Sequence, residues 1–494
     1  MVSKLQWAEW RIRALEARLR LEMIRKYGSK SEKLSDAQML LLELEPGVSA
    51  AEVEAECERE PLPATPSTAT AENKKRRKHP GRQELPAHLP RVEKLVPCTP
   101  EQCVCKACGK ETIVIGYEQS EQLDVKPTEF FVLVTKREKR ACQCCPEGGV
   151  KAAPLAAKII DKGLVSDRVV IDIVVSKYCD HLPLYRQSAI LERETGVSIG
   201  RATMAGWVMQ VGGFLIPVAG AVGREILAER YIQADETTVP VQMHDKRGKN
   251  HQAYLWQYGS PGGSVVFDFQ LGRSREGPKK FLSGFSGILQ TDGYTAYDTI
   301  GGSGMVHAAC WAHARRKVVD AVKLSPTDRM AIHLVKRMDA LFLIDAEARA
   351  AGINEVARHA LRQERSRPLI DDIKTDMEAA RAEVLPSSAL GKAIGYTLTL
   401  WPKLTQFLEH PELELSNNLA ENSMRPIAIG RKNWIHVGSE QAGPRVAAIL
   451  TVTESCRRLK LSIRDYLGSI LPGLANVSIK RVGEYTPAAW AARS

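Results

Sequence analysis

The stretches YIQADET at residues 231–237 and GILQTDGY at residues 287–294 decide the fold that this chain is expected to adopt. Each begins with a short apolar run that predicts a β-strand. Each run ends in a carboxylate, Asp235 in the first stretch and Asp292 in the second. Two strands that finish in aspartate can place both side chains at one edge of a sheet.

The residues between these two strands predict the rest of an α/β domain. Residues 253–258 and 264–269 are strand-like and are joined by Ser-Pro-Gly-Gly, which is typical of a hairpin. Residues 275–285 can form a helix that leads into the strand at 287–292. The sequence therefore predicts a sheet with both hairpin and helical connections.

A third carboxylate follows much later, in the segment SNNLAENSMR at residues 416–425. We expect a helix there that Ser416 caps and that carries Glu421 and Arg425 four residues apart on one face. Three carboxylates suit phosphodiester cleavage, in which two Mg²⁺ ions activate the attacking oxygen and stabilise the leaving oxygen. The spacing of the three acids along the chain is not diagnostic by itself.

Composition and charge favour a nucleic-acid partner without establishing one. The 494 residues include 69 basic and 58 acidic side chains, a formal net charge of +11. The first twenty residues are too highly charged for a signal peptide. The uncharged stretch at 206–223 contains five glycines and Pro217, so we expect a buried helix and a following turn rather than a membrane span. The expected location is the cytoplasm.

The N-terminal region predicts a helix followed by a linker. Residues 4–26 have a seven-residue apolar repeat, which fits a coiled-coil dimer or a helix packed on its own domain. From residue 46 the sequence contains few apolar side chains that could form a core, as is typical of a linker. A run of basic residues follows, which suits contact with DNA phosphates. Considered by itself, such a run also fits a charged segment that only contacts water. The run is Lys74, Lys75, Arg76, Arg77 and Lys78.

Two Cys-x-x-Cys pairs predict a structural zinc site. Each pair can aim two thiolates at one ion, and the two pairs complete a tetrahedral set. The pairs are Cys105 with Cys108 and Cys142 with Cys145. Between them, residues 121–137 alternate as strands do, for example from Phe131 to Val134. Free thiols are the alternative, and the ligand set could include other cysteines, namely Cys98, Cys103 and Cys144.

Residues 183–211 have the pattern of a helix-turn-helix. Pro183 suits the start of the first helix, Gly196 the turn and Ser198 the cap of the second helix. Arg201 and Thr203 then lie near the exposed start of the second helix, where a recognition helix meets base edges. The same pattern also fits an ordinary helical hairpin.

The sequence resembles the insertion-sequence-66 family of bacterial transposases over nearly the whole chain. The resemblance is carried most specifically by five segments: Ala234-Asp-Glu-Thr237, Thr291-Asp-Gly-Tyr294, Cys310-Trp-Ala-His-Ala-Arg-Arg-Lys317, Asn417-Asn-Leu-Ala-Glu-Asn422 and Gly430-Arg-Lys-Asn-Trp434. It implies a multidomain α/β protein with an N-terminal coiled coil, a zinc ribbon and a helix-turn-helix. The remaining part would be a ribonuclease-H-like catalytic domain with a helical insertion.

The resemblance also implies a site and partners. Asp235, Asp292 and Glu421 match the family's acidic triad, one position each, and would hold two Mg²⁺ or Mn²⁺ ions. The implied partners are element ends and target DNA, further copies of the chain in a synaptic complex, and two small accessory proteins of the same element. The N-terminal helix is short for the family's coiled coil.

Residues beside the triad receive separate predictions. Glu236 points to the opposite face of its strand from Asp235, so we expect a structural role. Cys310 and His313 are too few to form a second zinc site. We expect Cys310 to be a core thiol at the end of a strand and His313 to lie near the active site. Neighbouring arginines are expected near phosphate. They are Arg315 and Arg316, and the further candidate DNA contacts are Arg425, Arg431 and Lys432.

These predictions divide the chain into six parts: an N-terminal helical segment (1–45), a basic Pro-rich linker (46–92), a zinc-binding domain (93–150), a helix-turn-helix domain (155–228), a catalytic domain (229–450) with a helical insertion at about 320–412, and a C-terminal helical segment (451–494). We expect an active transposase in the cytoplasm, associated with the nucleoid. A DNA-binding regulator without catalysis is an alternative, which the presence of all three acids disfavours. A phosphodiester hydrolase without strand transfer would use the same residues.

Overall fold

The computed structural model describes residues 34–44, 130–141, 150–243 and 249–493, without 153, 155 and 162, and the single residues 12, 16, 19, 48, 53 and 54. The chain divides into a small unit, Pro66–Val134, and a larger unit made of the remainder. Of the small unit, only residues 130–134 are described. They form no strand, and Phe131–Val134 are exposed, so the prediction of strands at 121–137 is wrong for residues 130–137. Its other part, 121–129, lies outside the described residues. A short antiparallel hairpin follows instead, β1 (Lys139–Ala141) with β2 (Val150–Ala152).

A five-stranded mixed sheet with the strand order β5-β4-β3-β6-β7 forms the centre of the larger unit. Its strands are β3 (Tyr231–Val241), β4 (His251–Gly259), β5 (Val265–Gln270), β6 (Ile288–Thr291) and β7 (Val306–Ala309). Strands β3, β4 and β5 are antiparallel neighbours, whereas β6 and β7 run parallel to β3. The predicted hairpin and central α/β sheet are thus confirmed. Short helical elements α7 (Glu276–Phe281) and η2 (Thr295–Tyr297) flank β6, and α7 is shorter than the predicted 275–285.

Three helices precede the sheet: α4 (Asp167–Tyr178), α5 (Leu184–Thr195) and α6 (Arg201–Leu227). Gly196 ends α5 in the left-handed conformation at φ 71°, as expected for a C-terminal glycine. The predicted cap for the second helix was wrong, because α6 begins after Gly200 and Ser198 is an exposed residue outside it.

Helix α6 continues without the turn predicted within residues 206–223. Its glycines permit close packing instead: a Cβ at Gly212 would lie 2.9 Å from the Arg445 carbonyl oxygen of α15 (Gly443–Arg458). By length and composition α6 could cross a membrane, but half of its most apolar stretch is buried inside the protein. It therefore serves here as a core helix.

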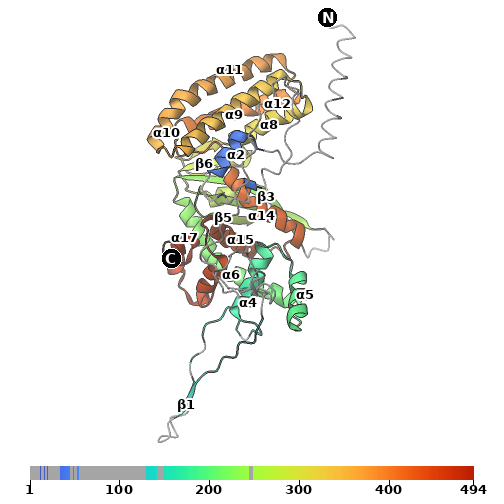
Figure 1. Ribbon diagram of the computed structural model, residues 1–494, viewed down its shortest axis with the longest axis vertical. Helices are drawn as coiled ribbons and strands as arrows, with labels where there is room; N and C mark the ends of the chain where they lie inside the picture. The colour runs from blue at the N-terminus through green and yellow to red at the C-terminus, as the bar shows by residue number, and fades with distance from the viewer. Residues whose placement is uncertain are drawn as a thin grey trace, which may run out of the picture. The chain divides into compact units, whose positions relative to one another are not determined.

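A group of helices follows β7 (Figure 1). Its members are α8 (Trp311–Leu324), α9 (Arg329–Ala350), α10 (Glu355–Leu361), the π-helical η3 (Arg362–Ser366), α11 (Arg367–Glu383), α12 (Ala389–Thr399), α13 (Trp401–Leu404) and η4 (Thr405–Leu408). All of them except α10 and η3 contribute to one apolar core, which includes Leu334, Met338 and Phe342. Helix α2 (Asp36–Glu43) packs on this group, and Arg349 donates a hydrogen bond to the Leu41 carbonyl.

The chain then returns to the sheet through α14 (Asn418–Trp434). After α15 it ends in α16 (Ile463–Ile470), η5 (Leu474–Asn476), η6 (Ile479–Tyr485) and α17 (Pro487–Ala491). Helices α6 and α15 pack against β5 in a second core, to which α4 and α16 also contribute. The sheet thus lies between two bodies of helices (Figure 1).

Candidate active site

Asp235 and Asp292 belong to neighbouring parallel strands. Gln233 of β3 pairs in register with Gln290 of β6. Asp235 and Asp292 each stand two residues further along, and Asp292 immediately follows β6. Because the strands are parallel and side chains alternate with a period of two, the two carboxylates lie level, just beyond the residues that pair β3 with β6. Asp235 does not end its strand as predicted, since β3 continues to Val241 and stays paired with β4.

A tight turn fixes the position of Asp292. Its Oδ1 accepts a hydrogen bond from the Tyr294 backbone N–H at 2.8 Å. Its carbonyl accepts another from the Tyr396 hydroxyl of α12 at 2.5 Å. Gly293 adopts φ +92°, and a Cβ there would lie 2.5 Å from Leu400 Cδ1. Only glycine therefore fits between this aspartate and the helices that cover it.

Glu421 lies in the first turn of α14 and faces α8. His313 Nε2 is 3.4 Å from Glu421 Oε1, and Arg316 Nη2 is 3.3 Å from Oε2. Burial lowers the pKa of His313, but Cys310 and Glu421 raise it, and the result is about 9. His313 is therefore beside the third carboxylate, and Cys310 is a buried residue at the start of α8.

Negative charge accumulates around Asp235. Burial raises its pKa well above the usual range, and Glu421, Glu236 and Asp292 raise it further. Burial also raises the pKa of Glu236. These shifts mean that the carboxylates are close enough to repel one another in a poorly hydrated place, which favours a proton or a cation there.

The donor set suits a hard divalent cation, because it consists of carboxylate oxygens with crowded negative charge. Within the described ranges, however, no three His, Cys, Asp or Glu side chains are already arranged to hold a metal ion. Glu421 pairs instead with His313 and Arg316, which hold the third carboxylate toward α8. The acids fit a metal chemically but do not form a closed cage.

Two buried glutamines, which the sequence prediction missed, connect the strands to the segment before α14. Gln290 Nε2 donates to the Glu414 carbonyl at 2.7 Å, and Gln233 Nε2 donates to the Ser416 carbonyl at 2.9 Å. The Tyr231 hydroxyl donates to Gln290 Oε1. Ser416 is therefore bound to the sheet and does not cap the helix as predicted, since α14 begins after Asn417. The repeated Gln-x-Asp spacing, at 233–235 and 290–292, is the signal that could have revealed this pair.

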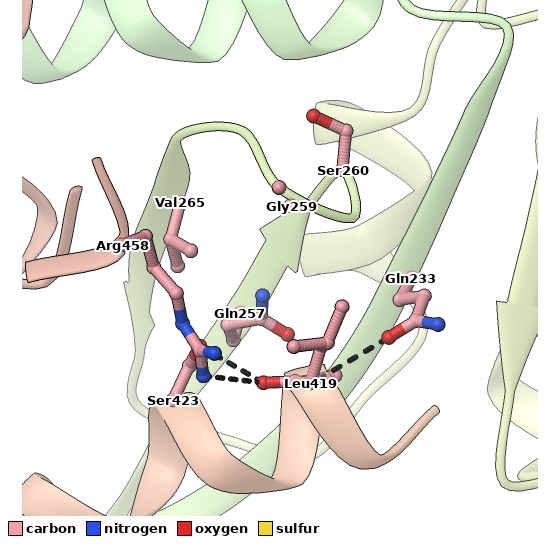
Figure 2. Close-up of a pocket in the computed structure, with 10 residues that line it drawn as sticks. Gln233, Gln257, Gly259, Ser260, Val265, Leu419, Ser423 and Arg458 are labelled. Carbon is pink, nitrogen blue, oxygen red and sulfur yellow. Dashed lines mark hydrogen bonds between the residues drawn. The ribbon is translucent and has the colours of Figure 1, made fainter. Parts of the chain in front are cut away.

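Arg458 of α15 holds the same helix from its other side. Its Nη2 donates to the Leu419 carbonyl and to Ser423 Oγ, both at 2.9 Å. Figure 2 shows Arg458 and Gln233 reaching the first turn of α14 from opposite sides of a small cavity. The turn that carries Glu421 is thus fastened to both the sheet and the C-terminal helices.

A buried ion-pair network extends this support into the helical group. Asp345 accepts from Arg362 and Arg358, both at 2.7 Å, and Glu414 pairs with Arg358 and Arg349. Arg362 is fully buried and also donates to the Leu413 carbonyl at 2.8 Å. The segment that leads to Glu421 is therefore held at Leu413 and Glu414 by α9, α10 and η3.

Glu236 occupies a separate position from Asp235. Its buried carboxylate accepts from Arg273 Nη2 at 2.5 Å. The Arg273 guanidinium lies 4.0 Å from the centre of the Tyr294 ring, and the Tyr294 N–H holds Asp292. Glu236 thus braces the loop beside Asp292, which is consistent with the structural role expected for it.

The predicted DNA contacts fall into different environments. Arg201 and Thr203 are exposed in the first turn of α6, and Lys432 is exposed in the last turn of α14. Arg431 bonds to Thr237 and Thr238 of β3. Three other residues have inward or partly buried positions: Arg315 pairs with Asp339 rather than facing outward, Arg316 reaches Glu421, and Arg425 is half-buried.

Two predictions lie outside the described residues. They concern the zinc ligands Cys105, Cys108, Cys142 and Cys145, and the basic run from Lys74 to Lys78. Most of the N-terminal helix predicted at residues 4–26 lies outside them as well.

Comparison with known proteins covers both units. A family model described as the Transposase IS66 family matches residues 162–445. The zinc-finger binding domain of transposase IS66 matches residues 102–146, and Transposase C of IS166 homeodomain matches residues 14–93. The zinc-finger match supports a structural zinc ion in the segment where the two cysteine pairs lie.

Curated relatives resemble the chain over most of its length. Uncharacterized protein y4qI of Sinorhizobium fredii is 33% identical over 95% of this chain and 87% of its own length. Uncharacterized protein y4hP of the same organism is 31% identical over 96% of this chain and 88% of its own length. Since the first family model alone matches more than half of the 494 residues, this chain belongs to the IS66 family of transposases.

Proposed function

We propose that this protein is a DNA transposase whose strand cleavage and strand transfer take place at Asp235, Asp292 and Glu421. One observation carries the proposal: three acids distant in the sequence come together, so that the other two raise the pKa of Asp235. Repulsion between carboxylates in a poorly hydrated place favours a bound cation, even though His313 and Arg316 pair with Glu421. Polynucleotide phosphoryl transfer is the chemistry for which such a set is suited.

The catalytic domain in this proposal is ribonuclease-H-like and spans residues 229–450. Three antiparallel strands followed by two parallel strands, with Asp235 on the central strand, support that assignment. The helices between about 320 and 412 would be its insertion. The proposed flanking parts are the N-terminal segment (1–45), linker (46–92), zinc domain (93–150), helix-turn-helix (155–228) and C-terminal helices (451–494).

The protein's own residues would hold the metal and set its geometry. Two Mg²⁺ or Mn²⁺ ions, when bound, would activate an oxygen nucleophile and stabilise the leaving oxygen. Asp292 is presented by its turn, and Asp235 lies level with it on β3. Glu421 would exchange its pairing with Arg316 for the metal. Arg316 would then become available to a DNA phosphate beside the site.

DNA would reach the site through basic surfaces on several parts of the chain. Exposed Arg201 and Thr203 on α6 suit base contacts, and Lys432 suits a phosphate contact. Arg425, Arg431 and the run from Lys74 to Lys78 are further proposed contacts. The zinc ligands would be Cys105, Cys108, Cys142 and Cys145. Element ends, target DNA, a second copy of the chain and small accessory proteins are the proposed partners, in the cytoplasm near the nucleoid.

A cleavage assay tests this proposal against its alternatives. Purified protein is incubated with DNA that carries the element's own ends, with Mg²⁺, with Mn²⁺ or with neither. We expect metal-dependent nicking that leaves a 3′-hydroxyl, followed by joining to a target plasmid. Binding without nicking under both metals would favour the regulator, and nicking without joining in the presence of the accessory proteins would favour the hydrolase.

A further inference from the structure

A pocket of about 280 Å³ lies at the C-terminal end of α14, and none of Asp235, Asp292 and Glu421 lines it. One wall comes from α4, α5 and α6, and the other from the residues that follow α14. Its walls combine aromatic and apolar side chains with a single lysine. The residues that define its character are Lys177, Tyr178, Leu184, Met209, Trp434 and His436.

Both chain turns that border this pocket are strained. His181, between Tyr178 and Leu184, has φ 56°, and Ile435, between Trp434 and His436, has φ 68°. Among the described residues only one other non-glycine residue, Lys460, has positive φ. This conformation is especially unfavourable for a β-branched side chain. Such strain gathers at ligand clamps, where the surrounding structure maintains it.

Ile435 is also unusual in its exposure. Its apolar side chain is 62% exposed, although it is held in an unfavourable backbone conformation between two lining residues. It follows Arg431 and Lys432 in the last turn of α14. An exposed apolar side chain beside cationic residues is the arrangement with which proteins separate stacked bases.

The chemistry of the lining suits an aromatic ring carried on a phosphate chain. The Lys177 ammonium lies 5.3 Å from the centre of the Tyr178 ring and 5.8 Å from that of Trp434. Burial lowers the pKa of Lys177 to about 8. No carboxylate is among the lining residues, and Asp180 and Glu440, nearby in the chain, are exposed. Aromatic walls with a cation bind nucleobases with little dependence on sequence.

We propose that this pocket receives an unpaired nucleobase of the bound element end, with Ile435 inserted into the gap that the base leaves in the stack. This inference rests on the proposed function, since it requires element DNA along α14. Glu421 and Trp434 are separated by 13 positions on one helix, which corresponds to about 20 Å. At about 3.4 Å per nucleotide along one DNA strand, that length corresponds to about six base steps. The captured base should therefore lie roughly six nucleotides from the cut end.

The test uses end DNA with 2-aminopurine at successive positions, full-length protein and no added Mg²⁺. Anisotropy of a distant dye measures binding independently. We expect a fluorescence change confined to one position, roughly six nucleotides from the cleavage point. A mismatch at that position should tighten wild-type binding about 10-fold, because pairing no longer has to be broken.

Ile435→Gly is the informative variant, because glycine accepts positive φ without strain and keeps the fold. We expect unchanged or improved thermal stability with loss of the position-specific signal. Lys177→Met should reduce the preference for the mismatch roughly 5-fold or more. Ile479→Ala is the matched control, since Ile479 is 65% exposed on η6 and lies outside the pocket lining.

The outcomes separate this inference from the function on which it rests. A signal at one position that survives Ile479→Ala but not Ile435→Gly supports the pocket. Tight end binding without any position-specific signal, or a signal unchanged in Ile435→Gly and Lys177→Met, overturns the pocket and leaves the transposase proposal intact. Absence of end binding by anisotropy contradicts both.

Discussion

The side-chain amide of Gln233 donates a hydrogen bond to the carbonyl of Ser416, 2.9 Å away, although 183 residues separate them in the chain. Gln290, level with Gln233 on the adjacent strand, makes the equivalent bond to Glu414 at 2.7 Å. Both glutamines are almost fully buried. Through these bonds, the strands that carry the two aspartates also fix the approach to the helix that carries Glu421.

The Gln290→Met variant should show whether Gln290 positions Glu421 in addition to stabilising the fold. It leaves the partly buried Glu414 carbonyl without its donor and the Tyr231 hydroxyl without this acceptor, which we expect to cost about 1–3 kcal/mol of unfolding free energy. Displacement of Glu421 should reduce strand cleavage by up to about 100-fold and raise the Mg²⁺ concentration needed for half-maximal cleavage. The matched control is Gln252→Met at an exposed position of β4, which should leave both quantities unchanged. An unchanged Mg²⁺ requirement in Gln290→Met would argue against the positioning role.

The turn after Asp292 gives a second prediction. Gly293→Ala places a methyl group 2.5 Å from Leu400 Cδ1 at a residue with φ +92°. We expect a loss of about 1–3 kcal/mol in unfolding free energy, measured by urea denaturation, and a defect in cleavage. Gly395→Ala on α12 meets no atom within 4 Å and should instead stabilise by about 0.5–1 kcal/mol. Equal effects of the two changes would contradict the crowding at Gly293.

The central sheet could be predicted from the sequence because its strands begin as apolar runs, as at 231–235 and 287–292. Burial on both faces of β3 and β6 makes that signal strong. Strand β7 is only four residues long, and it was foreseen only as a strand ending at Cys310. Local patterns therefore placed Asp292 correctly at the end of its strand, whereas Asp235 lies within β3, which continues to Val241.

Helix boundaries were harder to predict, because tertiary contacts decided them. Serine is a favourable residue at the N-cap of a helix. The Ser416 carbonyl, however, accepts a hydrogen bond from Gln233, and α14 starts two residues later. The glycines of α6 suggested a turn, but Gly212 serves close contact with α15. The glutamine pair could not be recognised as functional, since a lone buried glutamine carries no signal until its distant partner is known.

The buried pair of Arg362 and Asp345 gives a third prediction. Arg362→Met would leave Asp345 with Arg358 as its other partner and would remove the donor to the Leu413 carbonyl, so it should cost about 3–5 kcal/mol of unfolding free energy. Arg365→Met, at the fourth residue of the same π-helical segment, breaks a largely exposed pair with Glu347. That control should cost less than about 1 kcal/mol. Similar losses in the two variants would show that the Asp345 network does not hold the insertion together.

Acid stability should depend on the same carboxylate. Burial raises the pKa of Asp345, but Arg362 and Arg358 lower it more, to about 2. Because the folded pKa is below the unfolded value, the stabilisation is present above about pH 4 and is lost as the pH falls toward about 2. Between about pH 5 and pH 2, wild type should lose about 2 kcal/mol more unfolding free energy than Asp345→Asn. Parallel pH curves for the two proteins would contradict the assigned ion pairs.

The central claim is that Asp235, Asp292 and Glu421 form the site of strand transfer, and Asp292→Asn tests it most directly. The variant keeps the size of the side chain and its place in the turn but removes its charge. Wild type and variant are compared with element-end DNA, a target plasmid, Mg²⁺ and the accessory proteins, beside Asp371→Asn at an exposed position of α11. The account predicts joined products from wild type and Asp371→Asn and none from Asp292→Asn, which should still bind the ends. Equal joining by Asp292→Asn would contradict this assignment of the active site.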